Sequence, residues 1–308
     1  MSATTLALLH LLKTGDSIIA SRVLYGGTCE LLFHIIEKRF GIKVKVVDFN
    51  DIEAVKKAID KTTKVIYFES PTNPLLEIFD IKKITNLAQK HKIITIFDNT
   101  FAPPPIQYPL KLGADIVIQS LTKYIGGHAD LIGGAVIGSK KLLQPMFMES
   151  FIFFGPTMSP FTAYLAMRGM ETLEIRLQKQ SESTVKIAHF LESHPKISKV
   201  YYPGLTSNPQ YKIAKSQMKG FGSVLSFEVK GGYRAGEKLV NSVKIIHLAV
   251  SLGAVASLIE HPASMTHSEL TPEERKKAGI GDAVIRLSVG LEDIDDLIND
   301  LKQALVKV

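Results

Sequence analysis

The sequence predicts an α/β protein with a mostly parallel central sheet and a smaller α+β region at its C-terminal end. Short apolar runs alternate with helical patterns up to about residue 160, which is typical of strands joined by helical crossovers. After about residue 161 a long amphipathic helix comes first, and strands and helices then follow. The chain has 308 residues, 45% of them hydrophobic, and can bury a large core. We expect a domain over 1–160 and a second over 161–308 that contains the long bridging helix.

Six short apolar runs rich in β-branched residues predict the strands of the first domain. They are Ser17–Ala20, Val44–Val47, Lys64–Phe68, Ile93–Phe97, Ile116–Ile118 and Ala135–Ile137. Three segments between them carry apolar residues at three-to-four-residue spacing, which predicts helices over Glu30–Phe40, Asp51–Asp60 and Ile81–His91. The chain opens on a further helical pattern, with Ser2 as a possible cap.

The second domain is predicted to be antiparallel. Its bridging helix runs from Thr162 to roughly Leu191, and His194-Pro195 predicts a break. Four apolar segments predict strands: Val200–Tyr202, Gly222–Phe227, Ile245–Leu248 and Val284–Ser288. A last helix is expected from Asp293 to about Val306.

Composition disfavours several classes of protein. The net charge is +7, but basic and acidic residues alternate on helical faces without a basic stripe, so we expect no nucleic-acid partner. The single cysteine, Cys29, excludes an internal disulfide and a cysteine-based zinc site. No signal peptide is visible and no apolar run is long enough to span a bilayer, so we expect a cytoplasmic protein without a membrane partner.

Polar clusters follow four of the predicted strands. Tyr25 lies after the first, Asn73 after the third, Asp98 directly after the fourth and Lys123 after the fifth. Each has an ordinary explanation as a turn, cap or rim residue. The carboxyl ends of parallel strands share one edge of a sheet, where ligands bind, so the four clusters together predict a site at that edge.

Lys123 is the central residue of this predicted site. It stands between two apolar strands in Gln119–His128, and a buried lysine tends to have a lowered pKa, as an amine nucleophile requires. Ser120 and Thr122 could hold an anion beside it. An amine, a carboxylate and hydroxyls are what a pyridoxal 5'-phosphate (PLP) enzyme needs, for the covalent bond to the cofactor, its ring nitrogen and its phosphate. Alone, such a short motif is more often a surface turn.

The same residues resemble the PLP-lysine motif of the Cys/Met-metabolism, or trans-sulfuration, enzymes: methionine γ-lyase, cystathionine γ-lyase and γ-synthase, and O-acylhomoserine sulfhydrylase. The resemblance follows the family's order along essentially the whole chain. It is carried by Leu24–Thr28, Glu69–Pro74, Asp98–Phe101, Ser120–His128, Ser159-Pro160, Met167–Gly169, Ser251–Gly253, His261–His267 and Ile285–Glu292. It implies a fold-type I PLP-dependent transferase fold and a homodimer or homotetramer.

The resemblance also implies how the cofactor is held. Lys123 would bind it covalently, and Asp98 would pair with its pyridinium nitrogen. Asn73 would face its phenolic oxygen. Ser120 and Thr122 would bind its phosphate.

The remaining implied roles concern the substrate and the start of the chain. Tyr25 would stack on the cofactor ring and act as an acid-base group near the leaving sulfur. Arg286 would clamp the substrate carboxylate, helped by Ser251. Family members carry several dozen residues ahead of the position that matches Met1, including a Tyr-x-Arg pair for the neighbouring subunit's phosphate site. Without that N-terminal arm, we expect the helix that begins at Met1 and Ser2 to support the phosphate.

The resemblance favours γ-elimination, in which Lys123 removes the Cα proton and the products are a 2-oxo acid, ammonia and a thiol. Methionine γ-lyases usually have cysteine where Gly27 stands, and cystathionine γ-lyases an acidic residue where Ala256 stands, so the substrate stays open among methionine, cystathionine and homoserine types. γ-Replacement, as in cystathionine γ-synthase or O-acetylhomoserine sulfhydrylase, is one alternative, and a truncated, non-catalytic relative is another.

A serine β-lactamase is a weaker alternative. Ser120–Lys123 fits an S-x-x-K signature, but Lys13–Gly15 precedes it whereas the K-T-G element belongs last, and no S-x-N occurs.

Overall fold

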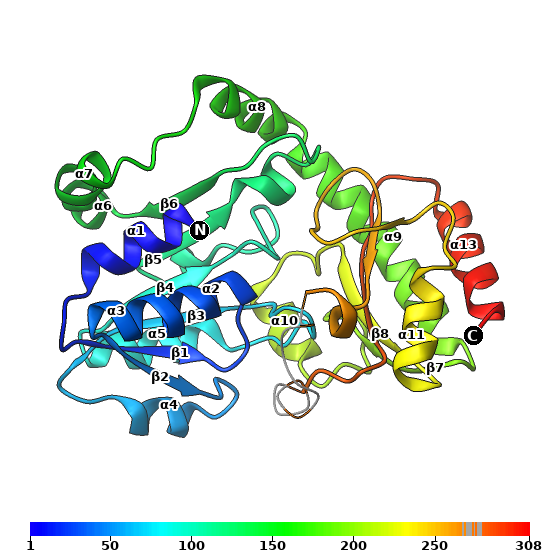
Figure 1. Cartoon of the computed structure of the whole chain (residues 1–308), viewed down its shortest axis with the longest axis horizontal. Helices are drawn as coiled ribbons and strands as arrows, with labels where there is room; N and C mark the ends of the chain where they lie inside the picture. Colours follow the sequence, from blue (N-terminus) through cyan, green and yellow to red (C-terminus); the bar gives the residue numbers. More distant parts are fainter. Residues whose placement is uncertain (267, 269–272, 274, 276–278) are drawn as a thin grey trace. The chain divides into compact units, whose positions relative to one another are not determined.

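The computed structural model describes residues 1–266, 268, 273, 275 and 279–308, and within them the chain forms two compact units (Figure 1). The first unit comprises Met1–Thr72, Ile78–Leu121 and Ile132–Ala163. The second comprises Asn73–Glu77, Thr122–Leu131 and Tyr164–Val308. The second unit thus takes two short segments from the first half of the chain. The division into a PLP-binding domain over 1–160 and a C-terminal domain stays a prediction.

A six-stranded sheet forms the centre of the first unit. Its strands are β1 (Ser17–Ser21), β2 (Lys43–Val47), β3 (Thr63–Glu69), β4 (Ile94–Asp98), β5 (Ile116–Ser120) and β6 (Gly134–Gly138). They lie in the order β2-β1-β3-β4-β5-β6, and all neighbours are parallel except β5 and β6. The mostly parallel sheet is therefore confirmed, and β1, β3, β4 and β5 end at one edge.

Helical elements cover both faces of this sheet. They are α1 (Ser2–Leu11), α2 (Gly26–Glu30), η1 (Leu31–Glu37), α3 (Lys38–Phe40), α4 (Ile52–Ala58), α5 (Ile81–Lys90), η2 (Pro109–Leu112), α6 (Lys140–Met146), η4 (Phe147–Phe151) and α7 (Ile152–Phe154). One face packs against α1 and η1 through Leu6, Leu8 and Leu32. The other packs against α4 and α5 through Val55 and Ile84.

Local sequence explains where these helices start. Asp51 caps α4 by accepting the amides of Glu53 and Ala54, and Asp80 caps α5 by accepting that of Lys83. The expectation that Ser2 caps the first helix is wrong. Met1 occupies the cap position without a side-chain bond, and Ser2 is the first helical residue.

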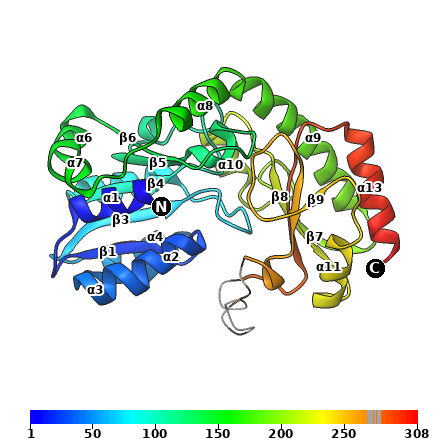
Figure 2. The same ribbon diagram turned by 45° about the horizontal axis from the view of Figure 1, so that its top comes forward.

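Figures 1 and 2 show α6 and α7 beside α1.

The predicted bridging helix is two helices rather than one. α8 (Pro160–Glu171) and α9 (Leu173–Ser193) are separated by Thr172, whose φ of −110° and ψ of 5° depart from helical geometry. The predicted break at His194 is confirmed, since His194 is extended ahead of Pro195.

The second unit contains a five-stranded sheet in the order β7-β8-β11-β10-β9. Its strands are β7 (Ile197–Tyr201), β8 (Val224–Val229), β9 (His247–Leu248), β10 (Leu258–Glu260) and β11 (Val284–Ser288). Its pairs are antiparallel except β9 with β10. The fully antiparallel expectation is therefore wrong at this edge, because the loop from residue 249 to 257 is long enough to return the chain in the same direction.

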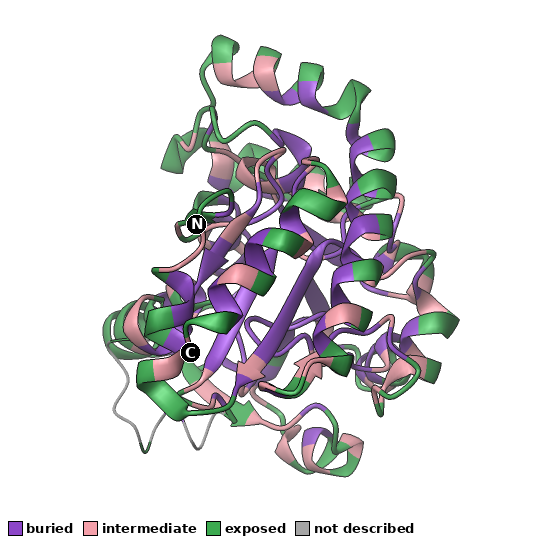
Figure 3. Cartoon of the chain, turned by 90° about the vertical axis from the view of Figure 1, so that its right-hand side faces the viewer, coloured by how far each residue is buried: buried purple, intermediate pink, exposed green. Residues whose placement is uncertain are grey.

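The helical elements of the second unit surround a separate apolar core. Besides α9 they are α10 (Tyr211–Gln217), α11 (Gly232–Val240), η5 (Pro262–Ser264) and α13 (Ile294–Val306). The core joins α9, α11, α13 and the inner strands through Leu191, Leu239, Leu301, Phe227 and Leu287. The inner strands β8 and β11 are largely buried, and the helices expose their outer faces (Figure 3). Within the described part of the chain, no helix is both long and apolar enough to cross a lipid bilayer.

Candidate active site

Lys123 lies in η3 (Leu121–Ile125), the turn that directly follows β5. Its φ of −92° and ψ of −128° interrupt the helical geometry of that turn. The side chain is half-buried, and its Nζ donates a hydrogen bond of 2.7 Å to Ser251 Oγ. Burial lowers the pKa of the Lys123 amine, the Arg286 charge lowers it further, and the Glu260 carboxylate opposes the shift. Burial and the neighbouring guanidinium thus both disfavour the protonated form of the amine.

Ser251 has an uncommon backbone conformation for a residue with a side chain, with a φ of +88°. Two hydrogen bonds from backbone amides of the residues that follow Ser251 hold its loop in place. The Gly253 amide donates to Ser288 Oγ at 2.9 Å, and the Val255 amide donates to the Gly127 carbonyl at 2.8 Å. A Cβ at Gly253 would lie 2.9 Å from the Tyr124 ring and backbone, so the loop packs closely against the lysine segment. These contacts hold Ser251 in its strained conformation.

Arg286 lies on β11 and is 4% exposed. Its Nη1 donates to Asn73 Oδ1 at 2.9 Å and forms an ion pair of 3.0 Å with Glu260 Oε1. Its Nη2 donates to the Ser251 carbonyl at 2.7 Å. Its Nε has no hydrogen-bond partner among the described residues. Burial lowers the pKa of Arg286, and the Glu260 charge counters this shift.

The second unit thus brings together four residues that the sequence predicted: Lys123, Ser251, Arg286 and Asn73. Asn73 Oδ1 accepts from Arg286 Nη1 at 2.9 Å. Thr122 precedes the lysine and is half-buried.

Sequence reasoning missed Glu260. It faces Arg286 across the β10–β11 pair, where the two residues are register partners. Its carboxylate is buried, Thr266 donates to Oε1 at 3.2 Å, and Oε2 has no partner among the described residues. Burial raises the pKa of Glu260, and Arg286 opposes this. A buried arginine requires a counter-charge, and Glu260 adjoins the His261–His267 motif, so a signal existed. His267 itself lies outside the described residues.

The first unit places Asp98 and Ser120 at the carboxyl ends of β4 and β5. Thr100 connects them, since its amide donates to Asp98 Oδ1 and its Oγ1 accepts the Ser120 amide, both at 3.0 Å. Tyr67 approaches Asp98 Oδ2 at 3.5 Å. Desolvation raises the pKa of Asp98, and the bonds from Thr100 and Tyr67 oppose the rise. A desolvated carboxylate of this kind favours a cationic partner.

Tyr25 and Met1 lie close to each other in the first unit. A Cβ at Gly27 would be 2.7 Å from the Tyr25 ring and 3.3 Å from Met1 Sδ. Tyr25 is 51% exposed, and its amide donates to Glu69 Oε2 at 3.0 Å. Glu69 is the register partner of Asp98 across β3 and β4. Ser2 is exposed at the start of α1.

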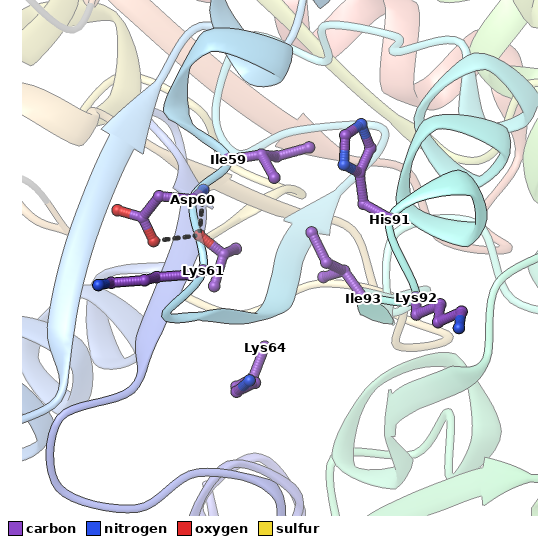
Figure 4. A pocket seen from close by; sticks show the side chains of 8 residues that line it. Ile59, Asp60, Lys61, Lys64, His91, Lys92 and Ile93 are labelled. Atoms are coloured by element: carbon purple, nitrogen blue, oxygen red, sulfur yellow. Dashed lines mark hydrogen bonds between the residues drawn. The ribbon is translucent and has the colours of Figure 1, made fainter.

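A surface cavity of about 470 Å³ lies at the opposite edge of this sheet, where β3 and β4 begin (Figure 4). Lys61, Lys64, His91 and Lys92 line it and are exposed. It contains none of the residues that the sequence singled out. Among the described residues, no group of three or more His, Cys, Asp or Glu could hold a metal ion.

The donor set fits PLP. The cofactor needs an amine that loses its proton readily, and the Lys123 pKa is lowered by burial. It also needs a carboxylate for its ring nitrogen, and desolvated Asp98 favours a cation. Ser120 and Thr122 offer hydroxyls next to the lysine in sequence.

Comparisons with known proteins agree with this chemistry. The family model of Cys/Met metabolism PLP-dependent enzymes matches residues 1–306. The chain is 49% identical to L-methionine γ-lyase of Fusobacterium nucleatum subsp. polymorphum, over 100% of this chain and 78% of that protein. It is 44% identical to cystathionine γ-synthase of Mycobacterium leprae, over 99% and 78%.

A solved structure extends the similarity to the fold. Cystathionine γ-lyase from Lactobacillus plantarum, crystallised with L-serine, superposes with a TM-score of 0.95 and 44% identity, over 100% of this chain and 80% of that one. The fold-type I expectation is confirmed. By its sequence and its fold, the chain belongs to the Cys/Met metabolism family of PLP-dependent enzymes.

Proposed function

We propose that this protein is a carbon–sulfur lyase that acts at Cγ of a sulfur amino acid and releases a 2-oxo acid, ammonia and a thiol. The observation that carries the proposal is the contact network of the second unit. A lysine amine with a lowered pKa lies 2.7 Å from Ser251, and Ser251 also contacts a buried arginine through its carbonyl.

In this proposal, five residues hold the cofactor. Lys123 bonds to it covalently, and Asp98 pairs with its ring nitrogen. Asn73 faces its phenolic oxygen. Ser120 and Thr122 bind its phosphate. When bound, PLP supplies an electron sink that stabilises negative charge developing on the substrate carbon.

Arg286 binds the substrate carboxylate. Protein acceptors occupy both Nη atoms, and among the described residues Nε–H and one Nη2–H are left without an acceptor. Two such donors suit a carboxylate, because the guanidinium presents them in a fixed plane. Asn73, Glu260 and the Ser251 carbonyl keep that plane in one orientation.

Lys123 moves the substrate protons. The substrate amine would first replace Lys123 on the cofactor, and the freed Nζ would then accept the Cα proton. Burial and the Arg286 charge both lower the pKa of this amine. Ser251 orients Nζ through the 2.7 Å bond. Tyr25 stacks on the cofactor ring and donates a proton to the leaving sulfur from its exposed position. Ser2 and Met1, at the start of α1, support the phosphate.

A spectrum and a mapped label test the proposal. Purified protein with added PLP is reduced with borohydride and digested, and the modified lysine is located. We expect the label on Lys123 and none in Lys123→Ala. Methionine and cystathionine are then assayed for 2-oxobutanoate and thiol, and O-acetylhomoserine for 2-oxobutanoate and acetate. Label elsewhere, or no cofactor absorption, would favour a non-catalytic relative.

γ-Replacement is a second candidate, because the chain is also 44% identical to a cystathionine γ-synthase. Adding cysteine to the O-acetylhomoserine reaction separates the two. A replacement enzyme forms a thioether amino acid and little 2-oxobutanoate, whereas a lyase forms 2-oxobutanoate with or without the thiol.

We also propose that the protein is a cytoplasmic homodimer or homotetramer. The first unit exposes large apolar side chains within a short stretch: Phe147, Met148, Ile152, Phe153, Phe154 and Phe161. Exposed apolar patches of this kind mark interaction surfaces. Light scattering coupled to gel filtration gives the mass in solution, and a monomer would contradict the proposal.

A further inference from the structure

Glu260 is a charged residue of the second unit that the proposed function uses only to orient Arg286. It is fully buried and forms its ion pair with Arg286 at 3.0 Å. A buried carboxylate is costly unless it is paired, and here the partner is the arginine proposed to receive a substrate carboxylate. The Arg286 guanidinium would therefore bind two carboxylates, that of Glu260 and that of the substrate.

The geometry gives Glu260 two opposite effects on ligand binding. Glu260 and Asn73 together occupy Nη1, which leaves Nε–H and one Nη2–H for the ligand. This arrangement favours binding. The Glu260 charge, however, repels a second carboxylate on the same guanidinium, where the two anions lie roughly 5–6 Å apart in a poorly solvated site.

None of the other described groups near Glu260 cancels this repulsion. Thr266 donates to Oε1 and carries no charge. Among the described residues, the charged groups that act on the Glu260 carboxylate are Arg286 and Lys123, and in the PLP-loaded protein the proposed covalent bond to the cofactor occupies the Lys123 amine. Arg286 and ionised Glu260 then sum to zero charge before a ligand arrives.

We propose that Glu260 is a positioning residue that aims Arg286 at the substrate carboxylate and, through its charge, limits how tightly that carboxylate is held. The inference rests on the proposed role of Arg286. The Glu260 charge would thus keep the affinity of this site for monocarboxylate substrates and products lower than Arg286 alone would give.

Two substitutions separate the two effects. Glu260→Gln keeps the size of the side chain and an oxygen that accepts from Nη1, but removes the charge. Its new amide group takes the place of Oε2, which has no partner among the described residues. Glu260→Asp keeps the charge, but is one methylene shorter and loses the 3.0 Å contact.

The probe is 4-(methylthio)butanoate, which has the side chain and carboxylate of methionine but no amine to react with the cofactor. Its Kd is measured by calorimetry at pH 8 with the PLP-loaded protein, and circular dichroism confirms that each variant is folded. We expect Glu260→Gln to bind the probe on the order of 10-fold more tightly, and Glu260→Asp several-fold more weakly, than the unmodified protein.

A third variant distinguishes failure of this inference from failure of the proposed function. Arg286→Lys is expected to weaken probe binding at least 10-fold, because a point charge replaces a planar fork. If Arg286→Lys weakens binding but Glu260→Gln binds no more tightly than the unmodified protein, the role of Glu260 is refuted. If Arg286→Lys binds the probe unchanged, the proposed carboxylate clamp is wrong and the role of Glu260 falls with it.

Discussion

Ser251 combines two features that substitutions can test separately. Its hydroxyl contacts the Lys123 amine, and its backbone has a strained, positive φ. Ser251→Ala removes the hydroxyl that accepts from Lys123 Nζ at 2.7 Å and keeps the φ of +88°. Ser251→Gly removes the same hydroxyl but tolerates that φ without penalty. Both variants should lose activity, and they should differ in stability.

The two magnitudes follow from separate features. One hydrogen bond to the amine is worth about 1–2 kcal/mol, so kcat/KM of both variants should fall about 10-fold. A left-handed backbone costs a residue with a side chain about 1–2 kcal/mol, partly offset by the greater freedom of glycine in the unfolded chain. The glycine variant should therefore exceed the alanine variant in stability by about 1 kcal/mol, or about 2–4 °C in Tm.

The assay is release of 2-oxobutanoate by each PLP-loaded variant, together with thermal unfolding of the same samples. Retention of full activity by either variant would show that the hydroxyl does not orient the amine. Equal stability of the two would show that the conformation at position 251 is not strained.

Three further substitutions test separate parts of the structure. Asp98→Asn should lower PLP-dependent activity on the order of 100-fold, since an amide cannot neutralise a protonated ring nitrogen, and an unchanged rate would refute that pairing. Gly127→Ala should destabilise the protein by about 2–3 kcal/mol in urea titrations, because a Cβ there would overlap the Arg176 guanidinium at a φ of +74°. The Asp300 carboxylate accepts hydrogen bonds from the backbone amides of Lys244, Ile245 and Ile246. Burial raises the pKa of Asp300, but these bonds outweigh burial and the pKa is lowered. Its stabilisation is thus present above the unfolded pKa of about 3.9 and is lost as pH falls through the lower folded value. Asp300→Asn should remove this pH dependence and cost about 2 kcal/mol at pH 7, which denaturation at several pH values measures.

The sequence predicted the elements that have a strong local pattern. All six strands of the first sheet were located, since each is a short, mainly apolar segment, and β11 was predicted from Val284 to Ser288 as it is observed. Lys123 was recognised for a related reason, as a charged residue placed between two such segments.

What the sequence could not reveal depends on pairing between distant segments. β10 has three residues and leaves no periodicity, so the register that places Glu260 opposite Arg286 could not be deduced. The strain at Ser251 arises from contacts that its loop makes with Gly127 and Ser288. The capping role expected of Ser2 failed because helix propensity alone does not decide by one residue where a helix starts.

The division of the chain between the two units limits how the protein can be cut and recombined. A fragment that begins at Tyr164 would contain most of the second unit but would lack Asn73–Glu77 and Thr122–Leu131, and with them two members of the Lys123 network. A fragment that ends at Ala163 would carry those two segments without their partners. Neither fragment contains a complete unit, so neither is suitable by itself for gene fusion or domain exchange. Exchange between relatives should instead be designed around all three blocks of the second unit together.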